Sequence, residues 1–292
     1  MLKQYCLEKA ALIDCALDKL MPSGHTHGQV LFDSMRYSLF AGGKRLRPIL
    51  LMAAADAVGG VGSNYLHAAC SLEIIHTYSL IHDDLPAMDD DDYRRGKPTN
   101  HIIYGEGMAI LAGDALLTAA FEVCLSQPDV QSDILLDVAK EIAIAAGAIG
   151  MVGGQAVDLS SEGKTLDAAT LQYMHQAKTG ALFRAALRSG AKLAGASATQ
   201  IAQLTVYAEQ FGLAFQITDD ILDVIGSQDK IGKPVGSDIR NQKATYVTLY
   251  SLEGANDMAR QAVDQALASL QDFGSEADIL RNLVQYLLTR DS

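Results

Sequence analysis

Apolar residues recur with helical spacing along almost the whole chain, and the residue-by-residue alternation typical of strands is nearly absent. Glycine and proline cluster at intervals and separate segments of helical length. These breaks fall at Pro22 to Gly28, Gly42-Gly43, Gly59 to Ser63, Gly105 to Gly107 and Gly226 to Gly236. The pattern predicts an all-α fold, a bundle of roughly ten or more helices joined mostly by short loops. No low-complexity linker divides the sequence, so we expect residues 1–292 to form a single all-helical domain.

The composition favours a globular protein without a nucleic-acid partner. Hydrophobic residues make up 49% of the chain and charged residues 20%, which allows a large core and argues against disorder. The 23 basic and 35 acidic residues give a formal net charge of −12. Proteins that bind nucleic acids usually present a basic surface, so this class is disfavoured.

The sequence predicts a cytoplasmic protein without stable membrane insertion. Its first twenty residues contain scattered acidic side chains and lack the apolar core of a secretion signal. The longest charge-free apolar run, Ile142 to Val157, is interrupted by glycines and falls short of the ~20 residues of a membrane span. The cysteines show no CxxC spacing and are typical of buried or incidental thiols in a reducing compartment. They are Cys6, Cys15, Cys70 and Cys124.

Two of the expected helices end in carboxylates. In the segment Ile201 to Ile225, an apolar row continues in steps of three and four residues onto Asp219 and Asp223. In the segment Tyr65 to Asp84, a similar row finishes at Asp83. A solvated acidic face would lie opposite the apolar stripe. Acid at the end of a buried row must instead be neutralised or paired.

The first acidic cluster consists of Asp83, Asp84 and Asp89. On an unbroken helix Asp83 and Asp89 would not share a face. Pro86 lies between them and disfavours a continuous helix. We therefore expect the chain to turn after the helix so that Asp89 points back toward Asp83.

The second cluster, Asp219, Asp220 and Asp223, places two carboxylates on one helical face through its i, i+4 spacing. Hard oxygen ligands without His or Cys suit Mg²⁺ or Ca²⁺ rather than zinc, and the Ca²⁺-loop pattern with its fixed glycine is absent. Mg²⁺ takes one or two carboxylates and completes its shell with water and substrate phosphate. Either run alone is equally typical of a solvated acidic loop. Two such runs favour two magnesium sites that face one cavity and grip a diphosphate.

Basic residues accompany these carboxylates. The segment Gly42 to Pro48 (GGKRLRP) places three cations beside two permissive glycines, so that backbone N–H groups can also contact an anion. Arg94 and Arg95 directly follow the first acidic run. Arg grips phosphate with two donors and Lys supplies a point charge, although each residue alone is more often a surface charge. Further candidates in the second half of the chain are Lys178, Lys233 and Lys243.

Five motifs together resemble the short-chain trans-isoprenyl diphosphate synthases, and most closely the bacterial farnesyl diphosphate synthases. They are GGKRLRP, HDDLPAMDDDDYRRGKPT, GGQAVDL, AKTGALF and FQITDDILD, and the resemblance spans at least Gly42 to Tyr246. The resemblance implies an isoprenoid synthase-type bundle of helices around a central cavity, usually as a homodimer. It also implies Mg²⁺-dependent joining of isopentenyl diphosphate to an allylic diphosphate, first dimethylallyl and then geranyl.

The resemblance further implies roles for single residues. The Mg²⁺ ligands would be Asp83 and Asp89 with Asp84 in support, and Asp219 with Asp220 and Asp223 near it. The allylic diphosphate would be held by Arg94, Lys178 and Lys243. Isopentenyl diphosphate would be held by Lys44, Arg47, His76 and Arg95. The developing carbocation would lie near Lys178, Thr179 and Gln216. Gly43 and Lys233 are also expected to bind substrate.

Product length is expected to depend on the helix that precedes Asp83. Ser79 and Tyr78 lie four and five residues before Asp83, about 6–7.5 Å along a helix. A growing tail that hangs from the metal site would meet them. In the family that the chain resembles, an aromatic residue at the position of Tyr78 stops growth at fifteen carbons. The alternative is an ordinary core tyrosine.

Other functions stay open. A geranylgeranyl diphosphate synthase has the same DDxxxxD spacing, and only its product differs. A terpene cyclase would carry Asn, Ser or Thr ligands in its second motif, where this chain has DDxxD. A non-catalytic partner subunit of a heteromeric synthase would usually have lost the acidic motifs, and both are intact here. A helical acidic protein that only buffers cations would bind Mg²⁺ without releasing diphosphate.

Overall fold

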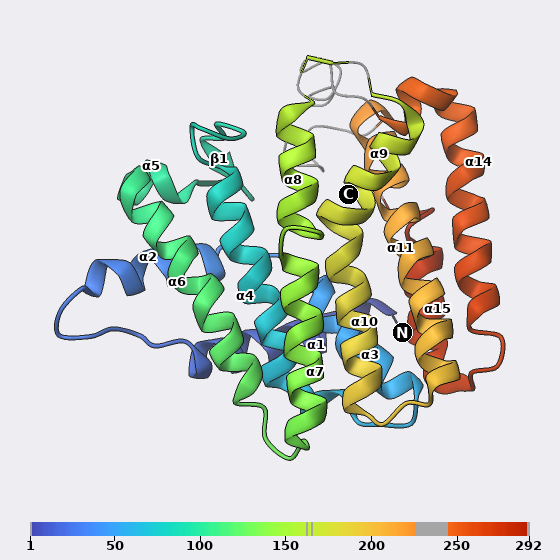
Figure 1. Cartoon of the computed structure of the whole chain (residues 1–292), viewed down its shortest axis with the longest axis horizontal. Coiled ribbons are helices and arrows are strands. Elements are labelled where there is room, and N and C mark those ends of the chain that lie inside the picture. Colours follow the sequence, from blue (N-terminus) through green and yellow to red (C-terminus); the bar gives the residue numbers. More distant parts are fainter. Residues whose placement is uncertain (1, 162, 165, 226–244, 291–292) are drawn as a thin grey trace. The chain divides into compact units, whose positions relative to one another are not determined.

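The computed structural model describes residues 2–161, 163–164, 166–225 and 245–290, and these are almost entirely helical (Figure 1). The expected all-α fold is confirmed. The chain divides into two compact units. Unit 1 comprises Met1–Met52 and Ser63–Ala139, and unit 2 comprises Ala53–Gly62 and Lys140–Ser292. A single domain over residues 1–292 stays a prediction.

Unit 1 contains the first acidic cluster and most of the basic candidates. Its elements are α1 (Leu2–Leu20), α2 (Gln29–Leu39), α4 (Leu66–Asp83), β1 (Tyr93–Arg94), β2 (Lys97–Pro98), α5 (Asn100–Tyr104) and α6 (Glu106–Leu125). The helices α3 (Leu46–Ala57) and α7 (Ser132–Ala146) contribute residues to both units, and a short 3₁₀ turn, η1 (Gly62–Tyr65), precedes α4.

The helix α4 forms the centre of unit 1 and packs against α6, α1 and α2. Leu72, Ile74 and Ile75 are completely buried on it. Each such side chain contributes about 1.5–3 kcal/mol through removal of apolar surface from water. The helix ends at Asp83, and the N–H of Leu85 donates to the carbonyl of His82 in the closing turn. Pro86 follows and cannot continue the helix.

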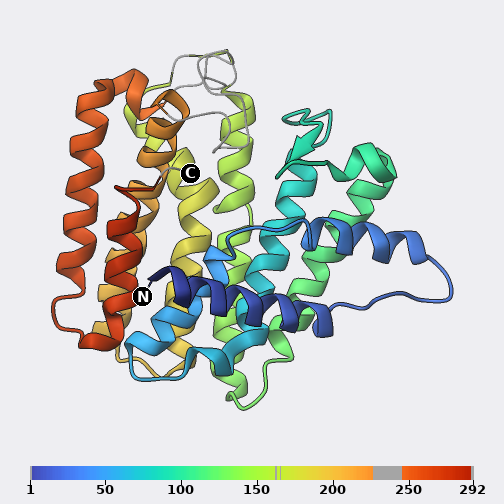
Figure 2. The same ribbon diagram turned by 180° about the vertical axis from the view of Figure 1, so that it is seen from behind.

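A two-stranded hairpin follows the acidic run and lies next to α5 beyond the end of α4 in both views (Figures 1 and 2). Its strands pair Tyr93 with Pro98 and Arg94 with Lys97. The two loop residues, Arg95 and Gly96, have φ values of 53° and 74°. A two-residue loop with both φ angles positive is a type I′ turn, which matches the twist of the strands. The hairpin therefore fixes the backbone from which Arg94 and Arg95 extend.

Unit 2 contains the second acidic cluster. Its elements are α8 (Met151–Ser160), α9 (Ala168–His175), the π-helical turn η2 (Gln176–Gly180), α10 (Ala181–Leu193), α11 (Ala198–Ile225), α14 (Tyr246–Ser269), η3 (Ser275–Ala277) and α15 (Asp278–Tyr286). The long helix α11 packs against α14 and α10, and its apolar row is buried at Leu204, Ala208 and Phe211. This row leads along the helix to Asp219, as the sequence predicts.

The sequence shows no charge-free apolar run long enough to span a membrane, whereas the helix α6 meets the length and hydropathy of such a span. Of its most apolar 18-residue stretch, 39% is buried. Buried helices of soluble proteins meet the same criterion. In unit 1 the helix packs against α4 and α2 and carries Asp114 and Glu122.

The four cysteines are free, and Cys70 and Cys124 are buried.

Candidate active site

The first acidic cluster is built on the end of α4. Asp83 is the last residue of the helix and Asp84 follows it. The backbone N–H of Asp89 donates to the carbonyl oxygen of Asp83 at 2.9 Å. The expected return of the chain toward Asp83 is therefore present in the backbone. Asp90 has a φ of 53°, which marks the sharp change of direction after this contact.

Asp84 and Arg94 form a bidentate ion pair. The Nε of Arg94 lies 2.7 Å and 2.9 Å from the two carboxylate oxygens, and the Asp84 side chain is only 5% exposed. Burial by itself would lower the pKa of Arg94, but the hydrogen bond and charge of Asp84 outweigh it and raise that pKa. The pair joins the hairpin to the end of α4. Arg94, a predicted ligand of the allylic diphosphate, is thereby held beside the first acidic cluster.

The glycine pair of GGKRLRP receives Arg95. The Nη1 of Arg95 donates to the carbonyl of Gly42. Gly43 has a φ of 138°, and a Cβ at this position would lie 2.7 Å from Arg95 Nη1. Because any side chain here would displace the guanidinium, the glycine is needed for the close approach. Gly43 and Arg95 thus lie far apart in the sequence but close together in the structure.

His76 stands among arginines. Its pKa lies well below 6.5, first because of burial and then because of the positive charges of Arg47, Arg95, Arg94 and Arg45. Burial also lowers the pKa of Arg47 to about 10, with Glu73 opposing this shift and Arg95 adding to it. Such a concentration of positive charge favours a bound anion. Arg47, His76 and Arg95, the predicted ligands of isopentenyl diphosphate, therefore share one electrostatic environment. Lys44 lies in the same loop and is exposed.

The proposed chain-length residues lie on α4 within unit 1. Tyr78 is 5% exposed, and its ring meets the edge of the His82 ring at 5.8 Å between centroids. Burial, followed by the charge of Asp83, raises the pKa of Tyr78 to about 12. The hydroxyl of Ser79 donates to the carbonyl of His76 at 2.9 Å.

Lys178 and Thr179 lie in the π-helical turn η2. The Nζ of Lys178 donates to the carboxylate of Asp158 on α8 at 2.7 Å. A Cβ at Gly154 would lie 2.2 Å from the backbone N of Lys178, so α8 approaches this turn as only a glycine allows. Single π-helical turns within helices occur frequently at functional sites. No role of Asp158 is predicted from the sequence, although it is the acidic residue of the motif GGQAVDL.

On the other side of η2, the helix α11 also approaches through a glycine. A Cβ at Gly212 would lie 3.3 Å from Gly180 Cα. Gln216, predicted to lie near the carbocation, follows Gly212 by four residues on the same helix and is partly buried. Gln216 therefore lies one turn along α11 from the contact with η2.

The second acidic cluster has a partner that the sequence analysis missed. Arg290 donates to the carboxylate of Asp219, to the carbonyl of Phe215 at 2.9 Å and to the hydroxyl of Thr218 at 2.8 Å. Its guanidinium also lies 4.4 Å from the centroid of the Phe215 ring. The Arg290 side chain is 5% exposed and that of Asp219 is 44% exposed. The buried Arg290 thus binds the Asp219 carboxylate from the protein interior, while the Asp219 side chain remains partly exposed to solvent.

Asp220 and Asp223 differ from Asp219. Asp220 is buried, and its carboxylate accepts the backbone N–H of Tyr246, the first residue of α14, at 2.7 Å. A carboxylate is stabilised at a helix N-terminus by the helix dipole. Asp220 therefore fixes the start of α14, and Asp223 lies one turn beyond Asp219, partly buried. The predicted substrate ligands Lys233 and Lys243 lie outside the described residues.

A sequence model of the family described as Polyprenyl synthetase matches residues 28–287. The chain belongs to the polyprenyl synthetase family. The resemblance drawn from the five motifs is confirmed.

Similar proteins indicate which type of reaction this polyprenyl synthetase catalyses. The Geranylgeranyl diphosphate synthase of Cyanophora paradoxa is 47% identical over 292 residues, covering 99% of this chain and 96% of that protein. The Farnesyl diphosphate synthase of Geobacillus stearothermophilus is 45% identical over 291 residues, covering 99% and 98%. A crystal structure of an FPP/GFPP synthase from Zymomonas mobilis superposes with a TM-score of 0.88 at 39% identity, with 98% of each chain covered. The chain is a short-chain trans-prenyltransferase with the isoprenoid synthase fold.

The carboxylates of this polyprenyl synthetase are donors of the kind that suits Mg²⁺. Among the described residues, no group of three or more His, Cys, Asp or Glu side chains is arranged to hold a metal alone. Mg²⁺ does not require such a cage, because it binds through one or two carboxylates and completes its shell with water and phosphate oxygens. Asp83 and Asp219, each at or near the end of an apolar helix, supply hard oxygen donors of this kind.

The buried His175 is expected to make the folded protein less stable in acid. It is 9% exposed, its Nδ1 has no partner among the described residues, and its ring meets Tyr246 at 5.4 Å. Burial lowers the pKa of His175 from 6.5 to about 4, with Asp158 opposing and Lys178 adding to the shift. As the pH falls below 6.5, the unfolded chain takes up this proton first, so stability is lost toward pH 4.

We expect the substitution His175→Phe to reduce this loss of folding stability at acid pH. Between pH 7 and pH 5 the free energy of unfolding of the variant should fall by about 2 kcal/mol less than that of the wild type. Urea denaturation at the two pH values measures the difference. An unchanged pH dependence would show that His175 is protonated equally in the folded and unfolded chains.

Proposed function

We propose that this prenyltransferase condenses isopentenyl diphosphate with dimethylallyl diphosphate and then with geranyl diphosphate, and that it releases farnesyl diphosphate in an Mg²⁺-dependent reaction. The observation that carries the proposal is the arginine cluster of unit 1. Arg47 and Arg95 surround a neutral His76 beside the glycine pair Gly42-Gly43, and Asp83 ends the same helix that carries His76. His76, a proposed diphosphate ligand, and Asp83, a proposed metal ligand, therefore lie on one helix.

The reaction follows from charge placement. The allylic C–O bond breaks, and its electron pair leaves with the diphosphate. Arg94 and Lys178 are each proposed as ligands of this group, and Mg²⁺, when bound, would supply the additional positive charge that stabilises it. The alkene of isopentenyl diphosphate, positioned by Arg47 and Arg95, gives its π electrons to the allylic cation and forms the new C–C bond. A proton then leaves for the departed diphosphate, which creates the new double bond.

The residues of the π-helical turn protect the cation. Lys178 and Thr179 supply backbone oxygens and a hydroxyl, and Gln216 supplies an amide oxygen, all of which stabilise positive charge without forming a covalent bond. Water must be kept from the cation, because it would quench the cation to an alcohol. The proposal requires no side-chain nucleophile. Lys233 and Lys243 complete the set of proposed substrate ligands.

The chain length of the product tests the proposed function. Incubation with dimethylallyl diphosphate, excess labelled isopentenyl diphosphate and Mg²⁺ should give farnesyl diphosphate as the main product. The alternative is a geranylgeranyl diphosphate synthase, which the 47% identity to the Cyanophora paradoxa protein supports. A main product of twenty carbons would establish this alternative. Absence of any condensation would instead favour the non-catalytic partner subunit of a heteromeric synthase.

Tyr78→Ala should lengthen the product. The ring of Tyr78 is buried five residues before Asp83, where it blocks a tail that grows along α4 from the diphosphate end. We expect products of twenty carbons or more to become the main species. Chromatography of the dephosphorylated products measures the distribution. An unchanged distribution would remove Tyr78 from this role.

We further infer that the enzyme is a homodimer in the cytoplasm. Apolar side chains that are about half exposed on α5 and α6 support the dimer, among them Ile102, Ile103, Ile110 and Leu111. A second copy would cover them, and a solution mass of one chain by light scattering would contradict it. The free thiols and the acidic composition support the cytoplasmic location.

A further inference from the structure

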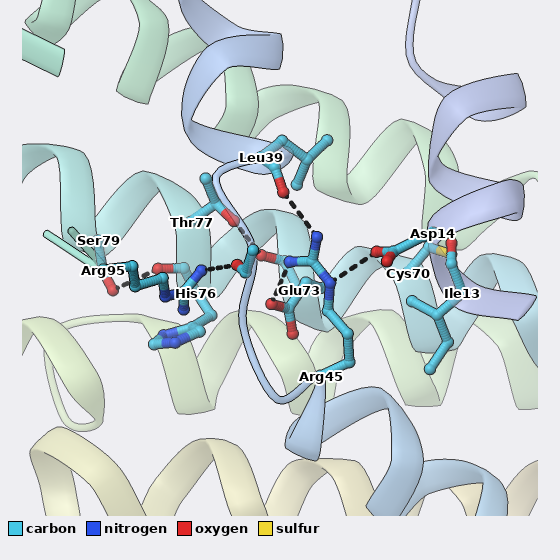
Figure 3. A network of polar contacts seen from close by, with 11 residues as sticks. Ile13, Asp14, Leu39, Arg45, Cys70, Glu73, His76, Thr77, Ser79 and Arg95 are labelled. Carbon is cyan, nitrogen blue, oxygen red and sulfur yellow. Dashed lines mark hydrogen bonds and ion pairs between the residues drawn. The ribbon is translucent and has the colours of Figure 1, made fainter. Parts of the chain in front are cut away.

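Arg45 lies at the centre of the motif GGKRLRP but faces the protein interior. It is 3% exposed, and its φ of 51° is unusual for a residue with a side chain. Its guanidinium donates to three acceptors at 2.8 Å, namely the carboxylate of Asp14, the carboxylate of Glu73 and the carbonyl of Leu39 (Figure 3). The acceptors belong to α1, α4 and α2. One side chain therefore ties the loop to three helices.

Glu73 compensates the charge of this region. Its side chain is 2% exposed, and it is bound to Arg45. The charge of Glu73 opposes the lowering of the pKa by burial at Arg45, Arg47 and Arg95, and only the pKa of Arg45 is raised overall. A buried carboxylate among several guanidiniums keeps them assembled before a diphosphate arrives. Glu73 also precedes His76 by three residues, so both lie on the same face of α4.

The backbone that Arg45 anchors is the backbone of the proposed isopentenyl diphosphate site. Gly42 and Gly43, which receive Arg95, come directly before Lys44 and Arg45, and Arg47 follows two residues later. Figure 3 shows Arg95 beside His76 and both next to the Arg45–Glu73 pair. Arg45 is therefore bound to the helix that supplies His76, while its own loop supplies Gly43 and leads directly into α3, whose first turn carries Arg47.

We propose that Arg45, held by Glu73 and Asp14, is the positioning residue of the isopentenyl diphosphate site. It makes no contact with substrate and acts by fixing the loop against α4. The inference rests on the proposed function, because it assumes that Arg47, His76 and Arg95 bind this diphosphate. Fixing these groups in advance lowers the entropy cost of binding.

The test is Arg45→Lys in the full-length protein. Lysine keeps the positive charge but is a point donor without the planar fork, so it does not reproduce all three bonds. We expect the KM for isopentenyl diphosphate to rise by about tenfold, as loss of about 1.4 kcal/mol of binding implies. The KM for geranyl diphosphate and kcat should each stay within about twofold, since the charge is retained.

The matched control is Arg36→Lys. Arg36 on α2 bonds Asp18 and the carbonyl of Met21 in the same unit, away from the glycine pair, and this variant should leave both KM values unchanged. Equal rises in both KM values for Arg45→Lys, a fall in kcat alone, or no change would each overturn the proposal. If Arg45→Lys does not fold, Asp14→Ala removes one of the three bonds at a half-exposed partner. It should raise the KM for isopentenyl diphosphate by about two- to threefold.

Arg47→Gln separates this inference from the proposed function. If Arg47→Gln raises the KM for isopentenyl diphosphate and Arg45→Lys does not, the assignment of the site stands and the positioning role of Arg45 fails. If Arg47→Gln leaves that KM unchanged, the proposed site itself is wrong.

Discussion

Asp83→Ala is expected to lower kcat by about a thousandfold or more while the helical content and the unfolding transition remain those of the wild type. Ionisation of the allylic diphosphate needs positive charge at the leaving oxygens, and the proposed magnesium ion depends on this carboxylate. Its loss removes stabilisation that exists mainly in the transition state, so kcat falls with kcat/KM. Steady-state rates with geranyl and isopentenyl diphosphates measure the effect.

The control for this variant comes from the same acidic run. Asp90→Asn removes one negative charge seven residues after Asp83 in the sequence. Asparagine tolerates the positive φ of 53° at this position. Its kcat should stay within about threefold of the wild type, because exposed charges contribute little. Near-normal turnover of Asp83→Ala would disprove the first metal assignment. Equal losses in both variants would show that the total charge of the run matters and not the single carboxylate.

Glu73→Gln is expected to lower the free energy of unfolding by about 3–5 kcal/mol. The substitution preserves the shape of the side chain but leaves the buried Arg45 with only the half-exposed carboxylate of Asp14 as counter-charge, and removing one partner of a buried ion pair costs this much. Arg45 and Glu73 are both about 2% exposed at their side chains, so water does not replace the lost interaction. Urea denaturation monitored by circular dichroism measures the change.

A surface pair provides the comparison. Arg260 and Asp257 lie on α14 with side chains 68% and 60% exposed. Asp257→Asn should change the free energy of unfolding by less than about 0.5 kcal/mol, because exposed ion pairs contribute little. A Glu73→Gln variant as stable as Asp257→Asn would mean that Arg45 finds another partner or reaches solvent. The account of Glu73 as the compensating charge would then be wrong.

Local patterns predicted the helices that carry the acidic motifs. The segment expected from Tyr65 to Asp84 is α4, Leu66–Asp83, and the one expected from Ile201 to Ile225 is α11, Ala198–Ile225. Both contain long apolar rows, and the first is terminated by a proline. The return of the backbone at Asp89 was also predictable, because Pro86 forces a turn within a short segment.

Partners that lie far apart in sequence were not predictable. Arg290 is separated from Asp219 by 71 residues, and Arg45 from Glu73 by 28. A sequence reveals that a buried charge needs a partner but does not indicate which residue supplies it. The π-helical turn that carries Lys178 was also missed, because its sequence has ordinary helical periodicity and its geometry depends on close contacts at Gly154 and Gly212.

The most direct measurement of the central claim is the release of inorganic pyrophosphate together with condensation, with and without magnesium. We predict that the wild-type enzyme, given isopentenyl and geranyl diphosphates, forms farnesyl diphosphate and pyrophosphate in equal amounts when Mg²⁺ is present. Neither product should form after treatment with a chelator, and both should return when Mg²⁺ is restored. Condensation that continues without any divalent cation, or Mg²⁺ binding that never leads to pyrophosphate release, would contradict the account.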